Sequence, residues 1–224
     1  MAFEPLRALL AAVLFASAPA WAIDRVAAAG DSIVFEGRIS RASADDFLRL
    51  LALGSATRLT ITSGGGDVEA GLDMAEAILE RGLDVEAPIR CQSSCSNYVL
   101  AAGRRKILGR PGAASWHGNM AHVLFLHASG RAPLGPNALA SALLLGERER
   151  AFYARAGVDG FLCWFAKIEP HDVPDFYALS VQDMARFGWL GVEIERPDAS
   201  PSPDAVLIDV DWDRAPPRQP GLPG

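Results

Sequence analysis

Residues 61–71 read I-T-S-G-G-G-D-V-E-A-G, and residues 91–95 read C-Q-S-S-C. The first stretch predicts a strand that runs into a glycine turn and then a helix, because three glycines let the backbone turn sharply and bring bare N–H groups close to a ligand. The second stretch places a nucleophilic side chain at another strand-to-helix junction. Two such junctions could form a glycine oxyanion hole that faces a reactive side chain.

Outward from these stretches, strands alternate with helices along the chain. Alternating apolar and polar residues predict a half-buried strand at 32–39, and Asp67 begins a helix that Gly82 ends. Pro88 marks either an edge strand or the end of a strand. The other predicted strands cover 58–61, 83–89, 106–108, 114–117, 123–127 and 192–195. Three further helices are predicted at 94–102, 137–156 and 158–168, and two more begin at Ser43 and Ser180. This order predicts the α/β class.

The first 22 residues have the pattern of a signal peptide. Arg7 precedes an apolar run at 8–16 that is too short to span a bilayer, and Ala20-Trp21-Ala22 is an A-x-A cleavage signal. We expect cleavage after Ala22, export to the periplasm or the exterior, and no membrane span afterwards. One domain then covers 23–195, and a proline-rich, largely disordered tail covers 196–224.

The net charge and the cysteine content limit which partners and which cellular compartment we expect. The net charge of −6 argues against a nucleic-acid partner. Three cysteines in an exported chain predict one disulfide and one remaining thiol. A tight turn before a helix would bring Cys91 and Cys95 within disulfide range. Cys163 lies in an apolar stretch, which favours a buried core thiol, although it could compete for Cys91.

The glycine stretch carries a family resemblance. Residues 62–71 resemble the N-S-P-G-G-x-V-x-A-G segment of the Clp protease proteolytic subunit, with Gly64 in place of the usual proline. Residues 178–180 and 185–188 resemble the closing F-L-S and E-Y-G-L elements of that family. Signal peptide peptidase A and the crotonases share its fold, and the C-x-S-x-C variant is similar to a branch of exported bacterial proteins. The resemblance implies a Clp/crotonase-like spiral of β-β-α units and a homo-oligomer.

The same resemblance implies a nucleophile, with two registers open. The interval from Gly66 to Cys95 matches the family's interval between glycine and nucleophile, and Gln92 begins a match to its Q-A-A-S, so Cys95 takes the place of the serine. Counting back from Gly103 gives that place to Ser94 instead. At a helix N-terminus the macrodipole would favour a Cys95 thiolate.

The remaining catalytic groups follow from the resemblance as well. His117 matches the family's histidine and would act as the base, and Asp172 matches its aspartate and would orient that base. The N–H groups of Gly65 or Gly66, with that of the residue after the nucleophile, would stabilise the oxyanion. Each of these residues also has an ordinary structural interpretation, such as a strand end, a solvated loop or a tight turn.

Three functions remain open on the sequence. The first is an exported peptidase or acyl hydrolase that acts on a peptide or protein. The second is a catalytically silent binding or assembly protein in which a Cys91–Cys95 disulfide removes the thiolate. The third, a crotonase-like acyl-CoA enzyme, is disfavoured because coenzyme A is expected in the cytoplasm. No cofactor is predicted, and no metal site either, because His117, His122 and His127 follow no familiar ligand spacing.

Overall fold

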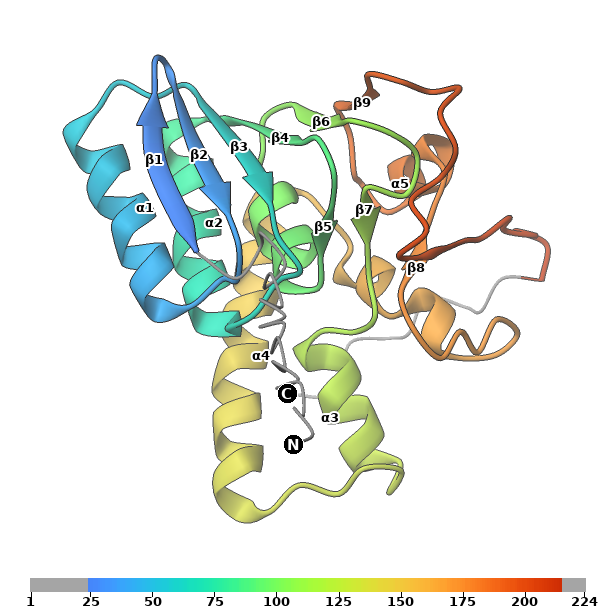
Figure 1. Cartoon of the computed structure of the whole chain (residues 1–224). Coiled ribbons are helices and arrows are strands. Elements are labelled where there is room, and N and C mark those ends of the chain that lie inside the picture. Colours follow the sequence, from blue (N-terminus) through green and yellow to red (C-terminus); the bar gives the residue numbers. More distant parts are fainter. Residues whose placement is uncertain (1–23, 215–224) are drawn as a thin grey trace, which may run out of the picture.

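The computed structural model describes residues 24–214 and has a mixed α/β fold around a six-stranded sheet (Figure 1). The strand order is β1-β2-β3-β4-β6-β9, and all neighbours are parallel except β1 and β2. The α/β class predicted from the sequence is therefore confirmed. The predicted signal peptide at 1–22 and the last ten residues of the predicted tail lie outside the described residues.

The bounds of the elements follow. The strands are β1 (Arg25–Ala29), β2 (Ser32–Glu36), β3 (Arg58–Thr62), β4 (Asp84–Ala87), β5 (Cys91–Gln92), β6 (Lys106–Leu108), β7 (Ala114–Ser115), β8 (Tyr177–Ala178), β9 (Val192–Ile194) and β10 (Val206–Leu207). The α-helices are α1 (Arg41–Leu53), α2 (Val68–Arg81), α3 (Met120–Ala128), α4 (Pro136–Ala156) and α5 (Val181–Arg186). A π-helical segment, η1 (Cys95–Leu100), and two 3₁₀ turns, η2 (Gly160–Cys163) and η3 (Phe165–Lys167), complete them.

The chain winds as a spiral that gives two strands to each turn. After β4 it forms β5, and after β6 it forms β7, and β5 and β7 pair in parallel in a second, smaller sheet. Ser63, which follows β3, forms a bridge to Cys91, and Trp116, which follows β7, forms a bridge to Tyr177 in β8. Each turn therefore places one strand in the large sheet and a shorter continuation beside it, which is the predicted β-β-α spiral.

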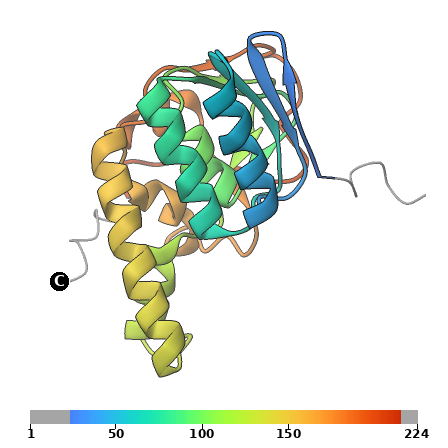
Figure 2. The same ribbon diagram turned by 90° about the vertical axis from the view of Figure 1, so that its left-hand side faces the viewer.

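The helices form a layer on one face of the large sheet. Figure 2 shows α1, α2 and α4 side by side there. Asp67 caps α2 by accepting a hydrogen bond from Ala70 N–H at 2.7 Å, and Gly82 ends it in the left-handed conformation, as predicted. A capping box of Ser40 and Ser43 starts α1 at Arg41, slightly earlier than the start predicted at Ser43. The buried faces of these helices cover the sheet residues Phe35 and Ile61.

Two predictions need correction. The strand predicted at 123–127 is part of helix α3. A short apolar run fits a strand or a buried helix equally well. Here the helix is favoured because Asn119 caps it and the carboxylate of Glu149, from α4, accepts hydrogen bonds from Met120 N–H and Ala121 N–H at 3.1 and 3.2 Å. The helix predicted at 158–168 is the pair of short turns η2 and η3 instead.

Two open points are resolved by the sheet. Strand β4 lies between β3 and β6 and ends just before Pro88, so this proline marks the end of a strand and not an edge. The tail predicted from 196 onward is not wholly irregular, because β10 pairs in parallel with β8. Within the described residues, no helix is both long enough and apolar enough to cross a membrane.

Candidate functional site

Two side chains meet at the ends of neighbouring parallel strands. Ser93 directly follows β5, and His117 comes two residues after β7. Because β5 and β7 are parallel, both residues lie at the carboxyl ends of the pair, where ligands of α/β folds commonly bind. Ser93 Oγ lies 2.8 Å from His117 Nε2. Ser93 is half-buried and His117 is exposed, so the pair is open to solvent.

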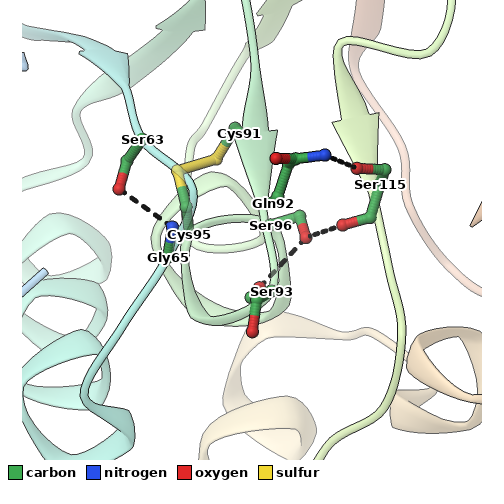
Figure 3. The surroundings of a disulfide bond; sticks show 8 residues. All are labelled: Ser63, Gly65, Cys91, Gln92, Ser93, Cys95, Ser96 and Ser115. Atoms are coloured by element: carbon green, nitrogen blue, oxygen red, sulfur yellow. Dashed lines mark hydrogen bonds between the residues drawn. A yellow bond between two sulfur atoms is a disulfide. The ribbon is translucent and has the colours of Figure 1, made fainter. Parts of the chain in front are cut away.

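Ser93 occupies a sharp turn between strand and helix. Its φ angle is 53°, a left-handed conformation that costs a non-glycine residue on the order of 1 kcal/mol. Its N–H donates to Ser115 O at 3.3 Å, and its carbonyl accepts from Asn97 N–H at 2.7 Å. The Ser96 hydroxyl lies within 3.0 Å of the Ser93 carbonyl and 2.5 Å of the Ser115 carbonyl (Figure 3). A serine presented on such a strained turn is typical of catalytic nucleophiles.

His117 is fixed by the residues on either side of it. Trp116 exchanges backbone hydrogen bonds with Tyr177, at 2.9 and 3.0 Å, and Asn97 Nδ2 donates to Gly118 O at 2.8 Å. The ring of Phe176 packs on the imidazole with a centroid separation of 4.4 Å. Partial desolvation lowers the pKa of His117 below its usual 6.5, and the nearby ammonium of Lys167 lowers that pKa further. The imidazole is therefore neutral at pH 7 and able to accept a proton.

The two predicted nucleophiles lie elsewhere in this turn. Cys95 is bonded to Cys91, with the Cα atoms 5.2 Å apart, and both residues are fully buried. In this oxidised state Cys95 has no thiol to ionise. Ser94 is also buried, and its hydroxyl donates to Gly66 O at 2.9 Å. The resemblance gives the place of the nucleophile to Cys95 or Ser94, whereas in the structure Ser93 is the residue whose hydroxyl meets His117.

The glycine turn lies against this serine, as the motif predicts. A Cβ atom on Gly65 would come within 2.8 Å of Ser93 Cβ and 2.9 Å of Ser94 N, so only glycine fits there. Gly65 N–H already donates to Ser63 Oγ at 3.0 Å. Gly66, with a φ of 152°, likewise has no room for a side chain, because its Cβ would overlap Ile39 O. The turn therefore brings backbone, and no side chain, to Ser93.

Asp172 follows η3 in a loop, with a φ angle of 45°. Its N–H donates to Ile168 O at 3.2 Å. In the part of the chain that the structure describes, none of the contacts of His117 involves Asp172; the charged group that affects His117 is Lys167. The structure thus brings together a serine, a histidine and a glycine turn, without the aspartate that the resemblance implies for the third position.

The sequence did contain a signal for Ser93. It stands at the centre of C-x-S-x-C, in which the flanking cysteines take the places of the glycines in the G-x-S-x-G turn of serine hydrolases. The remaining cysteine, Cys163, is buried and free, and its sulfur lies 3.1 Å from the hydroxyl of Tyr153, as expected for a core thiol. Desolvation raises its pKa well above the usual value, which makes it unreactive.

Two hollows of the surface lie away from this pair. One, of about 840 Å³, lies between α3 and α4 with Leu124, Phe125 and Trp164 in its wall. The other, of about 510 Å³, lies between α5 and the segment after β10. Neither wall includes Ser93 or His117. Among residues 24–214, no three or more His, Cys, Asp or Glu side chains are grouped to hold a metal ion.

Known proteins match this chain in the shape of the backbone and not in sequence. No protein-family model matches the chain, and neither does any curated protein sequence. Solved structures of similar shape include a mutant of ClpP1 from Listeria monocytogenes, with 15% sequence identity and a TM-score of 0.47 over 74% of this chain and 92% of that one. A likeness of this size concerns the course of the backbone and assigns no activity to this chain.

Proposed function

We propose that this protein is a serine-type hydrolase of peptide or other acyl bonds, with Ser93 as the nucleophile and His117 as the general base. The observation that carries this proposal is the 2.8 Å contact between Ser93 Oγ and His117 Nε2 on an accessible surface. The left-handed turn that presents Ser93 and the lowered pKa of His117 support it. A neutral imidazole is the form that can take the serine proton.

The reaction has two halves. In the first, Ser93 Oγ attacks the carbonyl carbon while its proton passes to His117 Nε2, and the imidazolium then donates that proton to the leaving group. In the second, a water molecule gives a proton to His117 while its oxygen attacks the acyl-serine, and the imidazolium returns that proton to Ser93 Oγ as the acid is released. Without a carboxylate on the histidine, a Ser–His pair orients and stabilises the imidazolium less well, so we expect a slow hydrolase.

The oxyanion donors would be the N–H groups of Ser94 and Gly66. Ile39 N–H donates to Gly65 O at 3.0 Å, and Asp67 N–H donates to Ile39 O at 2.8 Å. In such a parallel bridge the N–H and C=O of Gly66 point away from Ile39. On that other side the Gly66 carbonyl accepts the hydroxyl of Ser94, so the Gly66 N–H faces the turn that carries Ser93. Gly65 N–H is less suited because Ser63 already accepts from it.

We also propose that the protein acts outside the cytoplasm and as a homo-oligomer. The signal-peptide pattern of residues 1–22 supports export, and the Cys91–Cys95 disulfide is typical of oxidising compartments. The homo-oligomer rests on the family resemblance of the sequence. N-terminal sequencing of the exported protein tests the cleavage after Ala22, and light scattering of the purified protein tests the oligomer.

A fluorescent fluorophosphonate tests the hydrolase, because its phosphorus forms a bond to an activated serine oxygen and releases fluoride. We expect Ser93 to be labelled in the mature protein, as identified by peptide mass mapping, and short p-nitrophenyl esters to be hydrolysed. Ser93→Ala should abolish both, and His117→Ala should slow both about 100-fold or more while the protein stays folded. Ser94→Ala lacks the neighbouring hydroxyl but keeps the Ser94 N–H, so its Ser93 should still be labelled. Labelling of Ser93→Ala as fast as wild type would refute Ser93 as the nucleophile, and no labelling of either protein would leave the silent binding protein as the better hypothesis.

A further inference from the structure

We propose that the Cys91–Cys95 disulfide is a positioning element of the catalytic site: it holds the turn on which Ser93 reaches His117, and the site works only in the oxidised protein. This inference rests on the proposed hydrolase function. It departs from the view that a disulfide at this place silences the site, because the sulfur atoms belong to neither reacting group.

The disulfide encloses the nucleophile. Cys91 is the first residue of β5 and Cys95 is the first residue of η1, with Ser93 midway between them (Figure 3). The two Cα atoms are 5.2 Å apart, whereas an extended chain of four residue steps would span about 13 Å. The strand therefore reverses into the helix within three residues, and the bridge ties the two ends of that reversal together.

The turn needs such a tie because its conformation is unfavourable for serine. Ser93 has a φ of 53°, and its N–H makes only a long bond of 3.3 Å to Ser115. In G-x-S-x-G turns, glycines two residues before and after the serine let the strand and helix approach closely. Here cysteines occupy both positions, and their side chains fit at this short distance because they are joined to each other. Two side chains of similar size that are not joined by a disulfide would collide at this distance and push the start of β5 and the start of η1 apart.

The burial of the disulfide indicates a backbone role. Both cysteines are fully buried, whereas Ser93 is half-buried and His117 exposed. The bridge thus lies beneath the turn, in the core, where it cannot contact a substrate that reaches Ser93 from solvent. Breaking it should let the turn relax, move Ser93 Oγ away from His117 Nε2 and leave the surrounding surface unchanged. A loss in kcat with little change in KM distinguishes this from damage to substrate binding.

The experiment compares Cys91→Ala/Cys95→Ala with wild type and with Cys163→Ala. The last variant also removes a buried sulfur but keeps the disulfide, so it serves as the matched control. We expect the double variant to lose about 10- to 100-fold in kcat for p-nitrophenyl esters, because misplacing a reacting atom by about 1 Å has an effect of this size. The rate of fluorophosphonate labelling at Ser93 should fall by the same factor, and KM should change by less than about threefold.

Reduction of the wild-type protein provides a second route where the double variant fails to fold. Dithiothreitol supplies the two electrons and two protons that convert the bridge into two thiols and becomes a cyclic disulfide itself. Activity should fall as the two thiols appear by mass spectrometry and return when the protein is reoxidised. The Cys163→Ala protein should respond identically.

The outcomes separate the two proposals. A folded double variant, or a fully reduced wild type, with kcat within about twofold of the oxidised protein would overturn the positioning role while the hydrolase stands. An increase in activity would overturn it as well and identify the disulfide as an inhibitory device. Oxidised wild type without any labelling at Ser93 would overturn the hydrolase, and the positioning role with it.

Discussion

The reactivity of His117 depends on its immediate neighbours. Phe176 shields one side of the imidazole, and the ammonium of Lys167 lies close enough to lower the pKa of His117. Lys167 is itself held by the carbonyl oxygens of Pro174 and Asp175, at 2.7 and 3.2 Å. A nearby positive charge disfavours the imidazolium, so it keeps the base unprotonated to a lower pH, but it also opposes the imidazolium that forms during catalysis.

Removing this charge should shift the pH profile. In the proposed mechanism His117 acts as a neutral base, so kcat/KM should be level near pH 8 and fall as the pH drops through the pKa of this histidine, which lies below 6.5. In Lys167→Gln that pKa should rise, and the acid limb of the profile should move to higher pH. Lys167→Arg keeps the charge and is the control. Identical acid limbs in wild type and Lys167→Gln would show that the charge does not act on His117.

At the scale of elements, helix α3 depends on a buried carboxylate from α4. Glu149 is 2% exposed and accepts hydrogen bonds from Tyr98 Oη at 2.6 Å and from two N–H groups at the start of α3. Asn119 Oδ1 accepts a third N–H, that of His122, at 3.1 Å. These contacts account for the free N–H groups of the first helical turn and fix α3 against α4. Burial raises the pKa of Glu149 to about 7, although these hydrogen bonds partly oppose the rise.

This carboxylate should make stability depend on pH. The folded-state pKa of about 7 lies above the ordinary value of 4.5, so the folded protein binds more protons between these values, and its unfolding free energy should fall as pH rises through that window. Relative to Glu149→Gln, which cannot titrate, wild type should lose about 3 kcal/mol as the pH rises from 4.5 through the folded-state pKa, and the loss should level off above it. Urea unfolding measures this, with exposed Glu147→Gln as control. A constant difference across this range would contradict the prediction.

At the scale of the molecule, the segment after β9 ties the surroundings of His117 to helix α5. Val206 N–H donates to Phe176 O, beside the ring that packs on His117, and Gln92 Nε2 donates to Asp204 O at 3.4 Å. Further on, Trp212 packs against Phe165 and Phe187, with ring centroids 5.8 and 5.6 Å away. Its indole N–H donates to Asp183 at 2.6 Å. The segment predicted to be largely disordered thus contributes packing to the domain up to residue 214.

Removing the Trp212 side chain should lower the unfolding free energy measurably. Trp212→Ala removes a half-buried ring and an indole hydrogen bond, so we expect the unfolding free energy to fall by about 2 kcal/mol. Leu207→Ala, at a residue that is 42% exposed in β10, should change it by less than about 0.5 kcal/mol. Urea unfolding at constant pH compares the two. Equal losses in the two variants would mean that the segment is not anchored by Trp212.

The family resemblance supplied His117 as the base to be tested. The sequence by itself determined the α/β class, the glycine turn, helix α2 with its caps, and the pairing of Cys91 with Cys95 as one of two alternatives. These features depend on local patterns: glycine conformations, capping side chains and the alternation of apolar residues. The apolar run at 123–127 could not be assigned in this way. Its helical state depends on Glu149, a residue of another helix, whose contacts have no local signature.

The tertiary structure decided which serine meets the histidine. Ser93, Ser94 and Cys95 are consecutive. If the turn began one residue earlier or later, a different one of these side chains would point toward His117. The pairing of β5 with β7 and the disulfide beneath the turn together direct Ser93 toward His117, Ser94 toward Gly66 and Cys95 into the core. Local sequence determines that a turn forms here, whereas the directions of Ser93 and Ser94 depend on His117 and Gly66, which lie more than twenty residues away along the chain.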